Sequence, residues 1–130
     1  MSHLLVVLSN ALPGREDEFN EWYDAVHVHE MVDVLDGVRS AQRFVRAGPD
    51  DTAPPYKYLA LYEVDDVELA REQLRLQQED RAEAAAAGRA PLISPPRAMA
   101  ADALVGFFSA IGPRVDPARD PSRTATTHER

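Results

Sequence analysis

The sequence has no cysteine, which excludes disulfides, thiolate metal sites and thiol catalysis together. It also has no apolar run near the roughly 20 residues that a membrane-spanning helix needs. Basic side chains are scarce: 14 Lys and Arg stand against 22 Asp and Glu, a formal net charge of −8. This negative charge repels phosphate backbones and anionic lipids, so we expect neither nucleic acid nor membranes as partners.

Several functional motifs are missing as well. There is no phosphate-binding glycine loop, no serine-nucleophile motif and no dinucleotide fingerprint. The apolar run over residues 4–8 has no basic residue before it and is soon followed by Pro13-Gly14, which favours a buried strand over a secretory signal. We therefore expect a cytoplasmic protein. A length of 130 residues with 45% hydrophobic residues indicates one domain with a modest core.

Proline and glycine positions divide the chain into regular elements, because proline interrupts hydrogen-bonded structure. Residues 98–102 are predicted to form a short turn, although helix propensity extends across 98–112. We expect a folded domain over 1–112 and a disordered C-terminal tail over 113–130. The predicted elements are a strand at 3–9, a helix at 16–34 that ends at Asp36-Gly37, strands at 38–47 and 56–64, a helix at 67–87 capped by Asp65-Asp66, and a strand at 104–111.

This β-α-β-β-α-β order predicts an α+β, ferredoxin-like fold, with a four-stranded antiparallel sheet and both helices on one face. Both faces of the first strand are apolar, since Leu4, Val6 and Leu8 alternate with Leu5 and Val7. A sheet with one wet face should instead alternate apolar with polar residues. We therefore expect a homodimer in which the open sheet faces pack together and close a barrel.

Three segments carry a likeness to a known family: EDEFNEWYDAVHVHEM in the first helix, DGVRSAQRF entering the second strand, and YKYLALYEV in the third. With the pattern W-Y-D-x-x-H-x-x-E followed by G-V-x-x-A-x-R-F, the chain resembles the dimeric α/β-barrel superfamily and its EthD-like branch. The resemblance implies a substrate cavity between the first helix and the sheet. It leaves the reaction open, because relatives include cyclases, isomerases, cofactor-free monooxygenases, haem enzymes and accessory proteins.

His27 is the leading candidate for catalysis, because an imidazole exchanges protons near neutral pH. Helical spacing places Tyr23 and Asn20 on the same stripe, where they would bind a substrate carbonyl or stabilise an enolate. Glu30 lies one turn further on and would accept a hydrogen bond from the His27 ring, fixing its tautomer. The alternative is that His27 and Glu30 form only a structural pair on the helix surface.

Three further residues are candidates for substrate binding: Trp22, Glu30 and Arg43. Trp22 lies about 100° from the His27 stripe on an α-helix, where core packing is its alternative role. Arg43 needs a partner if it faces the interior, which would be either Glu63 on the next strand or an anionic substrate.

We expect no metal site and no cofactor. His27 and His29 are two residues apart and point about 200° from each other on a helix, so they cannot bind one ion. The sequence thus favours a small-molecule enzyme that acts on an apolar aromatic or polyketide-like substrate by acid/base chemistry: cyclisation, isomerisation or cofactor-free oxidation. The alternative is a non-catalytic homodimer that binds a small apolar ligand or serves as an accessory protein.

Overall fold

The structure is a computed structural model that describes residues 2–49 and 54–118. Its elements follow the predicted order. They are β1 (His3–Ser9), α1 (Glu16–Trp22), a π-helical turn η1 (Tyr23–His27), α2 (Val28–Val34), β2 (Val38–Val45), β3 (Tyr58–Val64), α3 (Val67–Ala87) and β4 (Leu104–Ser109).

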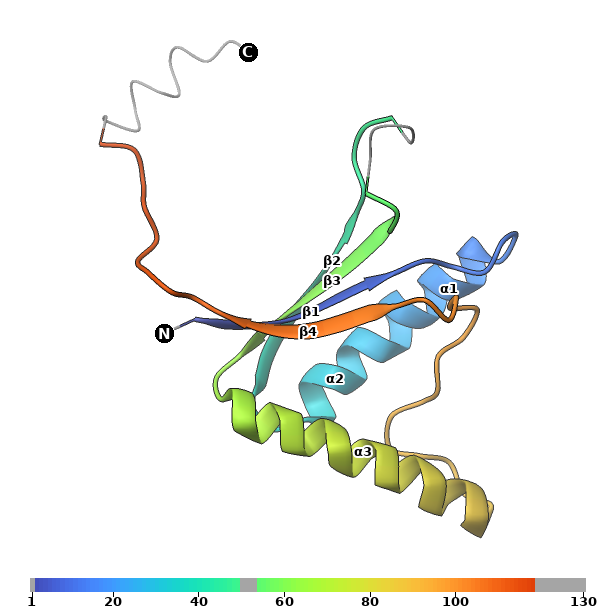
Figure 1. Ribbon diagram of the computed structural model, residues 1–130. Helices are drawn as coiled ribbons and strands as arrows, with labels where there is room; N and C mark the ends of the chain where they lie inside the picture. The colour runs from blue at the N-terminus through green and yellow to red at the C-terminus, as the bar shows by residue number, and fades with distance from the viewer. Residues whose placement is uncertain (1, 50–53, 119–130) are drawn as a thin grey trace.

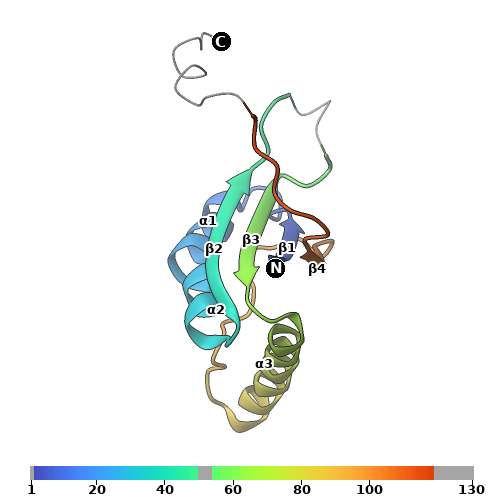
Figure 2. The same ribbon diagram turned by 90° about the vertical axis from the view of Figure 1, so that its left-hand side faces the viewer.

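The four strands form one antiparallel sheet in the order β2-β3-β1-β4. This order is that of the ferredoxin-like fold, so the predicted α+β fold class is confirmed. The three helices lie on the same side of the sheet (Figure 1), and α3 extends past the ends of the strands (Figure 2). No helix in the described part of the chain is long and apolar enough to cross a membrane.

The core lies between the helices and one face of the sheet. On β3, Tyr58, Ala60, Tyr62 and Val64 are buried and alternate with more exposed residues, as the two-residue period of a strand requires. The first helix contributes the other half of this core. Its buried side chains are Phe19, Trp22, Tyr23 and Met31. Leu35, which directly follows α2, is buried with them.

The opposite face of the sheet has no cover within the chain. Leu4, Val6 and Leu8 of β1 point to this face. Most of their partners on the two neighbouring strands are apolar, and the exceptions are Glu63, opposite Leu4, and Gly106, opposite Val6. Phe44, Leu104 and Phe108 share this face and are 40%, 55% and 61% exposed. The apolar second face that the sequence predicts is therefore present. Burying such a surface would be favourable in water. We refer to this surface as the open face.

Three strand ends differ from the sequence prediction. β2 ends at Val45 and β3 begins at Tyr58, because the loop between them contains Pro54-Pro55, which lack the amide donors of a sheet ladder. β4 ends at Ser109, opposite His3, where its partner strand β1 begins. Residues 98–102 form a bend and a turn rather than a helix, and Met99 bridges to Ala11. Of the tail predicted over 113–130, residues 119–130 lie outside the described part.

A β-bulge changes the faces that the sequence assigns to β2. The register shifts between Val38 and Ser40, so Val38 pairs with Val64 and is buried on the helix side. Ser40, Gln42 and Phe44 lie on the open face. Strict alternation would place Val38 on the open face with them, but the bulge inserts one residue into the ladder and turns Val38 to the other side.

The π-helical turn η1 interrupts what the sequence predicts as one regular helix. Residues five apart are about 140° apart around an α-helix, whereas a wider π turn brings them near one another on the same face. Here the rings of Trp22 and His27 stack, with centroids 4.5 Å apart and planes 21° apart. Placing Trp22 away from the His27 stripe is therefore wrong, and the inserted residue is the reason.

Asp66 rather than Asp65 caps α3, because its side chain accepts a hydrogen bond from the Leu69 amide at 3.1 Å. We expect Asp66→Ala to lower the free energy of unfolding by about 1 kcal/mol, the usual loss for such a cap. Asp65→Ala removes only an exposed pairing with Arg39 and should change it by less than about 0.5 kcal/mol. Urea denaturation of both variants measures the difference, and equal losses would contradict the assignment.

Candidate functional site

A cavity of about 330 Å³ lies between the first helix, the helix side of the sheet, α3 and the segment that joins α3 to β4. Its size and position match those of small-molecule sites, which are concave and mostly apolar. The residues that line the cavity all belong to one chain, so the cavity does not need a second copy to form. Apolar side chains that line it include Leu5, Met31, Leu74, Ile93 and Met99.

His27 forms part of the cavity wall and is held there by aromatic contacts. Its ring stacks on Trp22 and meets the ring of Tyr23 edge to face at 5.1 Å. The Nδ1 atom is buried and has no hydrogen-bond partner. All three aromatic side chains line the cavity, so the first helix brings together three of the six residues singled out in the sequence.

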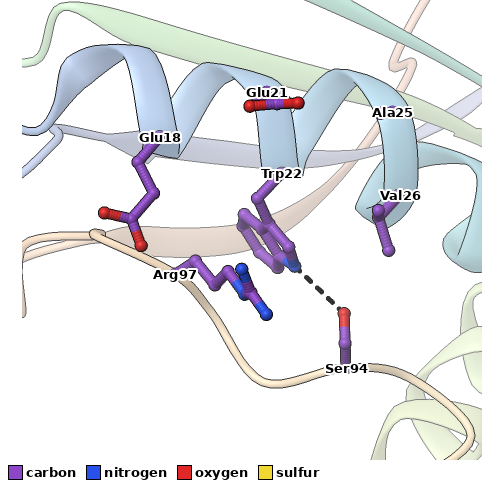
Figure 3. Close-up of a pocket in the computed structure, with 7 residues that line it drawn as sticks. All are labelled: Glu18, Glu21, Trp22, Ala25, Val26, Ser94 and Arg97. Carbon is purple, nitrogen blue, oxygen red and sulfur yellow. Dashed lines mark hydrogen bonds between the residues drawn. The ribbon is translucent and has the colours of Figure 1, made fainter.

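Glu30 does not orient His27 as expected. Its Oε1 is 3.9 Å from His27 Nδ1, too far for a hydrogen bond. The carboxylate instead accepts hydrogen bonds from the Ser94 amide at 3.1 Å and from Ser94 Oγ at 3.0 Å. Ser94 Oγ in turn accepts a hydrogen bond from Trp22 Nε1 at 3.0 Å (Figure 3). Glu30 therefore positions Trp22 and the joining segment. It is close to His27 but forms no hydrogen bond with it.

The joining segment is fixed to the rest of the chain at several points. The Leu92 amide donates to Asp80 at 2.8 Å, next to the Glu30–Ser94 contacts. Further along, the Leu12 amide donates to the carbonyl of Ala98 at 2.7 Å, beside the bridge between Ala11 and Met99. The hydrogen bonds from Leu92 and Arg89 hold the pKa of Asp80 below its usual value, so this anchor is charged at neutral pH.

Burial governs the ionisation of His27. Burial, the larger cause, and the positive charge of Arg81 together lower the pKa of the ring from 6.5 to about 4. Glu30 would favour the charged ring, but its oxygens already accept three hydrogen bonds from Ser94. His27 is therefore neutral at pH 7, with a free ring nitrogen that can donate or accept depending on the tautomer.

Two phenols complete the polar part of the wall. Burial raises the pKa of Tyr23 and of Tyr62, so both are neutral hydrogen-bond donors at pH 7. Tyr62 Oη has no hydrogen-bond partner that meets normal geometry, although the hydroxyl of Tyr23 lies close enough to influence it. The other face of Tyr23 packs against the guanidinium of Arg43, with 4.4 Å from Cζ to the ring centroid.

Unpartnered polar atoms are concentrated around this cavity. In the described part of the chain, four buried side-chain nitrogen or oxygen atoms lack a hydrogen-bond partner. Three belong to residues that line the cavity: His27 Nδ1, Tyr62 Oη and Gln77 Oε1. A buried polar atom without a partner costs about 1–3 kcal/mol, so such atoms call for a partner that the chain itself does not supply.

Asn20 and Arg43 belong to a separate cluster rather than to the cavity. Arg43 donates to Asp24 Oδ1 at 2.7 Å and to Asn20 Oδ1 at 2.8 Å. Asn20 also donates to Tyr58 Oη at 3.2 Å, and an open depression forms around these side chains. The expectation that Asn20 shares the stripe of His27 is wrong, because the π turn rotates the residues after it.

The partner considered for Arg43 in the sequence, Glu63, is also wrong. Arg43 pairs with Ala60 in the sheet and faces the helices, whereas Glu63 lies on the open face and accepts a hydrogen bond from Ser40 at 2.8 Å. The guanidinium of Arg43 contacts the rings of Phe19, Tyr23 and Tyr58, between 4.4 and 5.4 Å from their centroids. It thus joins the first helix to β2 and β3.

Sequence reasoning missed three polar cavity residues on α3, Gln77, Gln78 and Arg81. Gln77 and Arg81 continue the helical stripe of Ala70, Leu74 and Ala84, and both alanines are fully buried. A core-facing stripe is normally apolar throughout, so two polar residues at its centre are the signal that was available. Nothing in the sequence distinguishes Tyr62 from a tyrosine that fills a core, and only its unpartnered hydroxyl and its place in the cavity wall mark it as part of a site.

Among residues 2–49 and 54–118, no group of three or more His, Asp or Glu side chains is arranged to hold a metal ion.

Comparison with known proteins supports the fold. The sequence matches no family model and no curated protein. A solved structure of an EthD (ethyl tert-butyl ether d) family protein from Bacillus halodurans C-125 is similar, with a TM-score of 0.54 at 15% sequence identity. The similarity covers 85% of this chain and all of the other. The expected ferredoxin-like, EthD-like fold is therefore confirmed, and at this identity the likeness concerns the fold alone.

The low pKa of His27 can be tested by NMR titration of the imidazole protons. We expect one of the four histidines to titrate near pH 4, and His27→Gln should remove that signal. Arg81→Gln should raise the pKa of His27, because a neighbouring positive charge is removed. A His27 that titrates near 6.5 in the folded protein would show that the ring is solvated.

Proposed function

We propose that this protein is a small-molecule enzyme that binds an apolar aromatic or polyketide-like substrate in the cavity and transfers a proton through His27. The observation that carries the proposal is that three residues lining the mostly apolar cavity, His27, Tyr62 and Gln77, each have a buried polar atom without a hydrogen-bond partner. The apolar walls would hold the rings of a substrate, and the free polar atoms would bind its oxygen functions.

The chemistry follows from the protonation states. Neutral His27 accepts a proton from carbon, the electrons of the C–H bond move onto the neighbouring carbonyl oxygen, and an enolate forms. The neutral hydroxyls of Tyr62 and Tyr23 donate hydrogen bonds to the negative oxygen, which is how enolates are stabilised in enzymes. Return of the proton to another carbon completes an isomerisation. In a cyclisation, the enolate carbon would attack a second carbonyl carbon of the substrate, the electrons of that C=O double bond would move onto its oxygen, and the proton from His27 would return to this oxygen. An oxidation without cofactor would require dioxygen as a second substrate.

The low pKa of His27 limits the substrate. A base is efficient only when its pKa is close to that of the proton it removes or to the working pH. A ring whose pKa is about 4 therefore acts on a hydrogen that is already acidic, such as one between two carbonyl groups or on a phenol. Polyketide-like and phenolic molecules contain such hydrogens, and they fit the apolar walls.

The proposal can be tested with the 1,3-diketone benzoylacetone in D₂O, by following deuterium exchange at its central carbon by NMR. We expect the protein to accelerate exchange over buffer, and His27→Gln to reduce that acceleration about a hundredfold. Tyr62→Phe should reduce it about tenfold, because one donor to the enolate is lost. His29→Gln, two residues away and exposed, should leave it unchanged. Equal exchange with wild type and His27→Gln would refute the role of His27.

A second candidate function is non-catalytic binding of a small apolar ligand. Its support is that His27 Nδ1 receives no hydrogen bond from the residues that the structure describes, whereas a catalytic imidazole is usually oriented by one. The same exchange experiment separates the two. Saturable binding of benzoylacetone without acceleration of exchange would favour the binding protein.

We also propose that the open face mediates homodimerisation, and that the protein works in the cytoplasm, where a chain without cysteine loses nothing to reducing conditions. The open face is self-complementary in character, since it is apolar across three neighbouring strands. A twofold pairing of two such sheets would bury Phe44, Leu104 and Phe108 at once.

Sedimentation velocity at micromolar concentration tests the dimer. We expect the wild type to sediment as a dimer and Phe108→Asp as a monomer, because a buried charge without a partner costs several kcal/mol. Val115→Asp adds the same charge at an exposed position beyond β4 and should remain dimeric. Phe44→Asp provides a second disruption on a different strand, and circular dichroism checks that each variant is folded. A folded monomeric wild type would overturn the dimer.

A further inference from the structure

We propose that the molecule bound in the cavity is an anion, a compact apolar carboxylate whose charged end is bound by Arg81 at the mouth of the cavity. This inference rests on the proposed function, because it assumes that the cavity takes a small molecule. It adds the chemical class of that molecule and its orientation.

The first support is that Arg81 has no partner among the residues that the structure describes. It lines the cavity, is exposed, and forms no hydrogen bond or ion pair with any residue that the structure describes. Most of the other arginines in residues 2–49 and 54–118 are paired with carboxylates, among them Arg15, Arg39, Arg43, Arg75 and Arg89. In a chain with 22 acidic and 14 basic residues, a free guanidinium at a cavity is unexpected unless it has another use.

The second support is the composition of the cavity wall. Arg81 is the only charged residue among the described residues that line it, although carboxylates are abundant elsewhere. The neighbouring cavity on the other side of Trp22 contrasts with this. There Arg97 shares the wall with Glu18 and Glu21 (Figure 3), so the residues lining that cavity include more negative than positive side chains. Of these two cavities, only the first has a positively charged lining, which favours an anion.

The third support is the place of Arg81 on α3. Gln77 and Arg81 are four residues apart and so lie on one face of the helix, between buried Ala70 and buried Ala84. The stripe thus changes from apolar to polar only where it meets the cavity. A guanidinium binds a carboxylate through two parallel hydrogen bonds, and Gln77 Oε1 is free to accept a hydrogen bond from a hydroxyl further in.

The ligand would therefore have two polar ends. The carboxylate would lie at Arg81, and a hydroxyl or carbonyl would reach the free atoms of His27 and Tyr62 inside. Binding of an anion would also cancel the positive charge that disfavours protonation of His27. The other groups that face the ring are Trp22, Tyr23 and Glu30, and only Glu30 is charged. His27 would thus become a stronger base when the substrate is in place.

Calorimetric titration with a matched pair of probes tests this, using 1-hydroxy-2-naphthoate and its neutral analogue 1-hydroxy-2-naphthamide. We expect the carboxylate to bind about tenfold more tightly than the amide, which corresponds to one charge-assisted contact. Arg81→Gln should abolish that preference, and Arg81→Lys should retain part of it. Arg71→Gln is the matched control, because it removes the same charge from α3 at a residue that packs on Phe107 away from the cavity.

Quenching of the fluorescence of Trp22, the one tryptophan of the chain, shows whether the probes bind at this cavity. If both probes bind equally well and Arg81→Gln has no effect, the anionic class is wrong while the proposed cavity function stands. If neither probe binds, the proposed function itself is contradicted. A loss of preference in Arg71→Gln as large as in Arg81→Gln would show a general charge effect and would also overturn the role of Arg81.

Discussion

The inserted residue of the π turn is the constraint on which the site depends. Without it, Trp22 and His27 would point in different directions from the helix, and the two rings would not stack. With it, the indole fills the wall between two cavities, and its nitrogen is available to Ser94. A π turn is less favourable than an α turn and is frequent at functional sites, which suits a helix shaped around a cavity rather than around a core.

The wall of that cavity combines a mostly apolar surface with polar atoms that have no hydrogen-bond partner. Most of its wall is what a core would contain, yet the hydroxyl of Tyr62, the ring nitrogen of His27 and the amide oxygen of Gln77 are left without partners. Phenylalanine or leucine at these positions would satisfy packing at lower cost. Their polar atoms also come from three different elements, β3, the first helix and α3, so the arrangement is a property of the fold and not of one motif.

The sequence predicted the fold well because periodicity and chain breaks are local signals. The bounds of β1 and α3 and the apolar character of the open face follow directly from residue order. The site was predicted less completely, because two insertions are invisible to a regular period. The π turn moved Asn20 away from His27, and the bulge after Val38 changed the face of that residue. Glu30 was given the wrong partner because Ser94 is 64 residues away, and contacts at that separation leave no local trace.

Hydrogen bonds at several points restrict the movement of the segment between α3 and β4. Asp80, Glu30 and the backbone of Leu12 hold this segment at Leu92, Ser94 and Ala98. A rigid-body movement of this segment away from the cavity would break several of these hydrogen bonds at once. The exposed long side chains of α3 that line the cavity, Gln78 and Arg81, can change rotamer without breaking these hydrogen bonds. Such side-chain rotations take place in picoseconds to nanoseconds at exposed positions, whereas backbone rearrangements are slower.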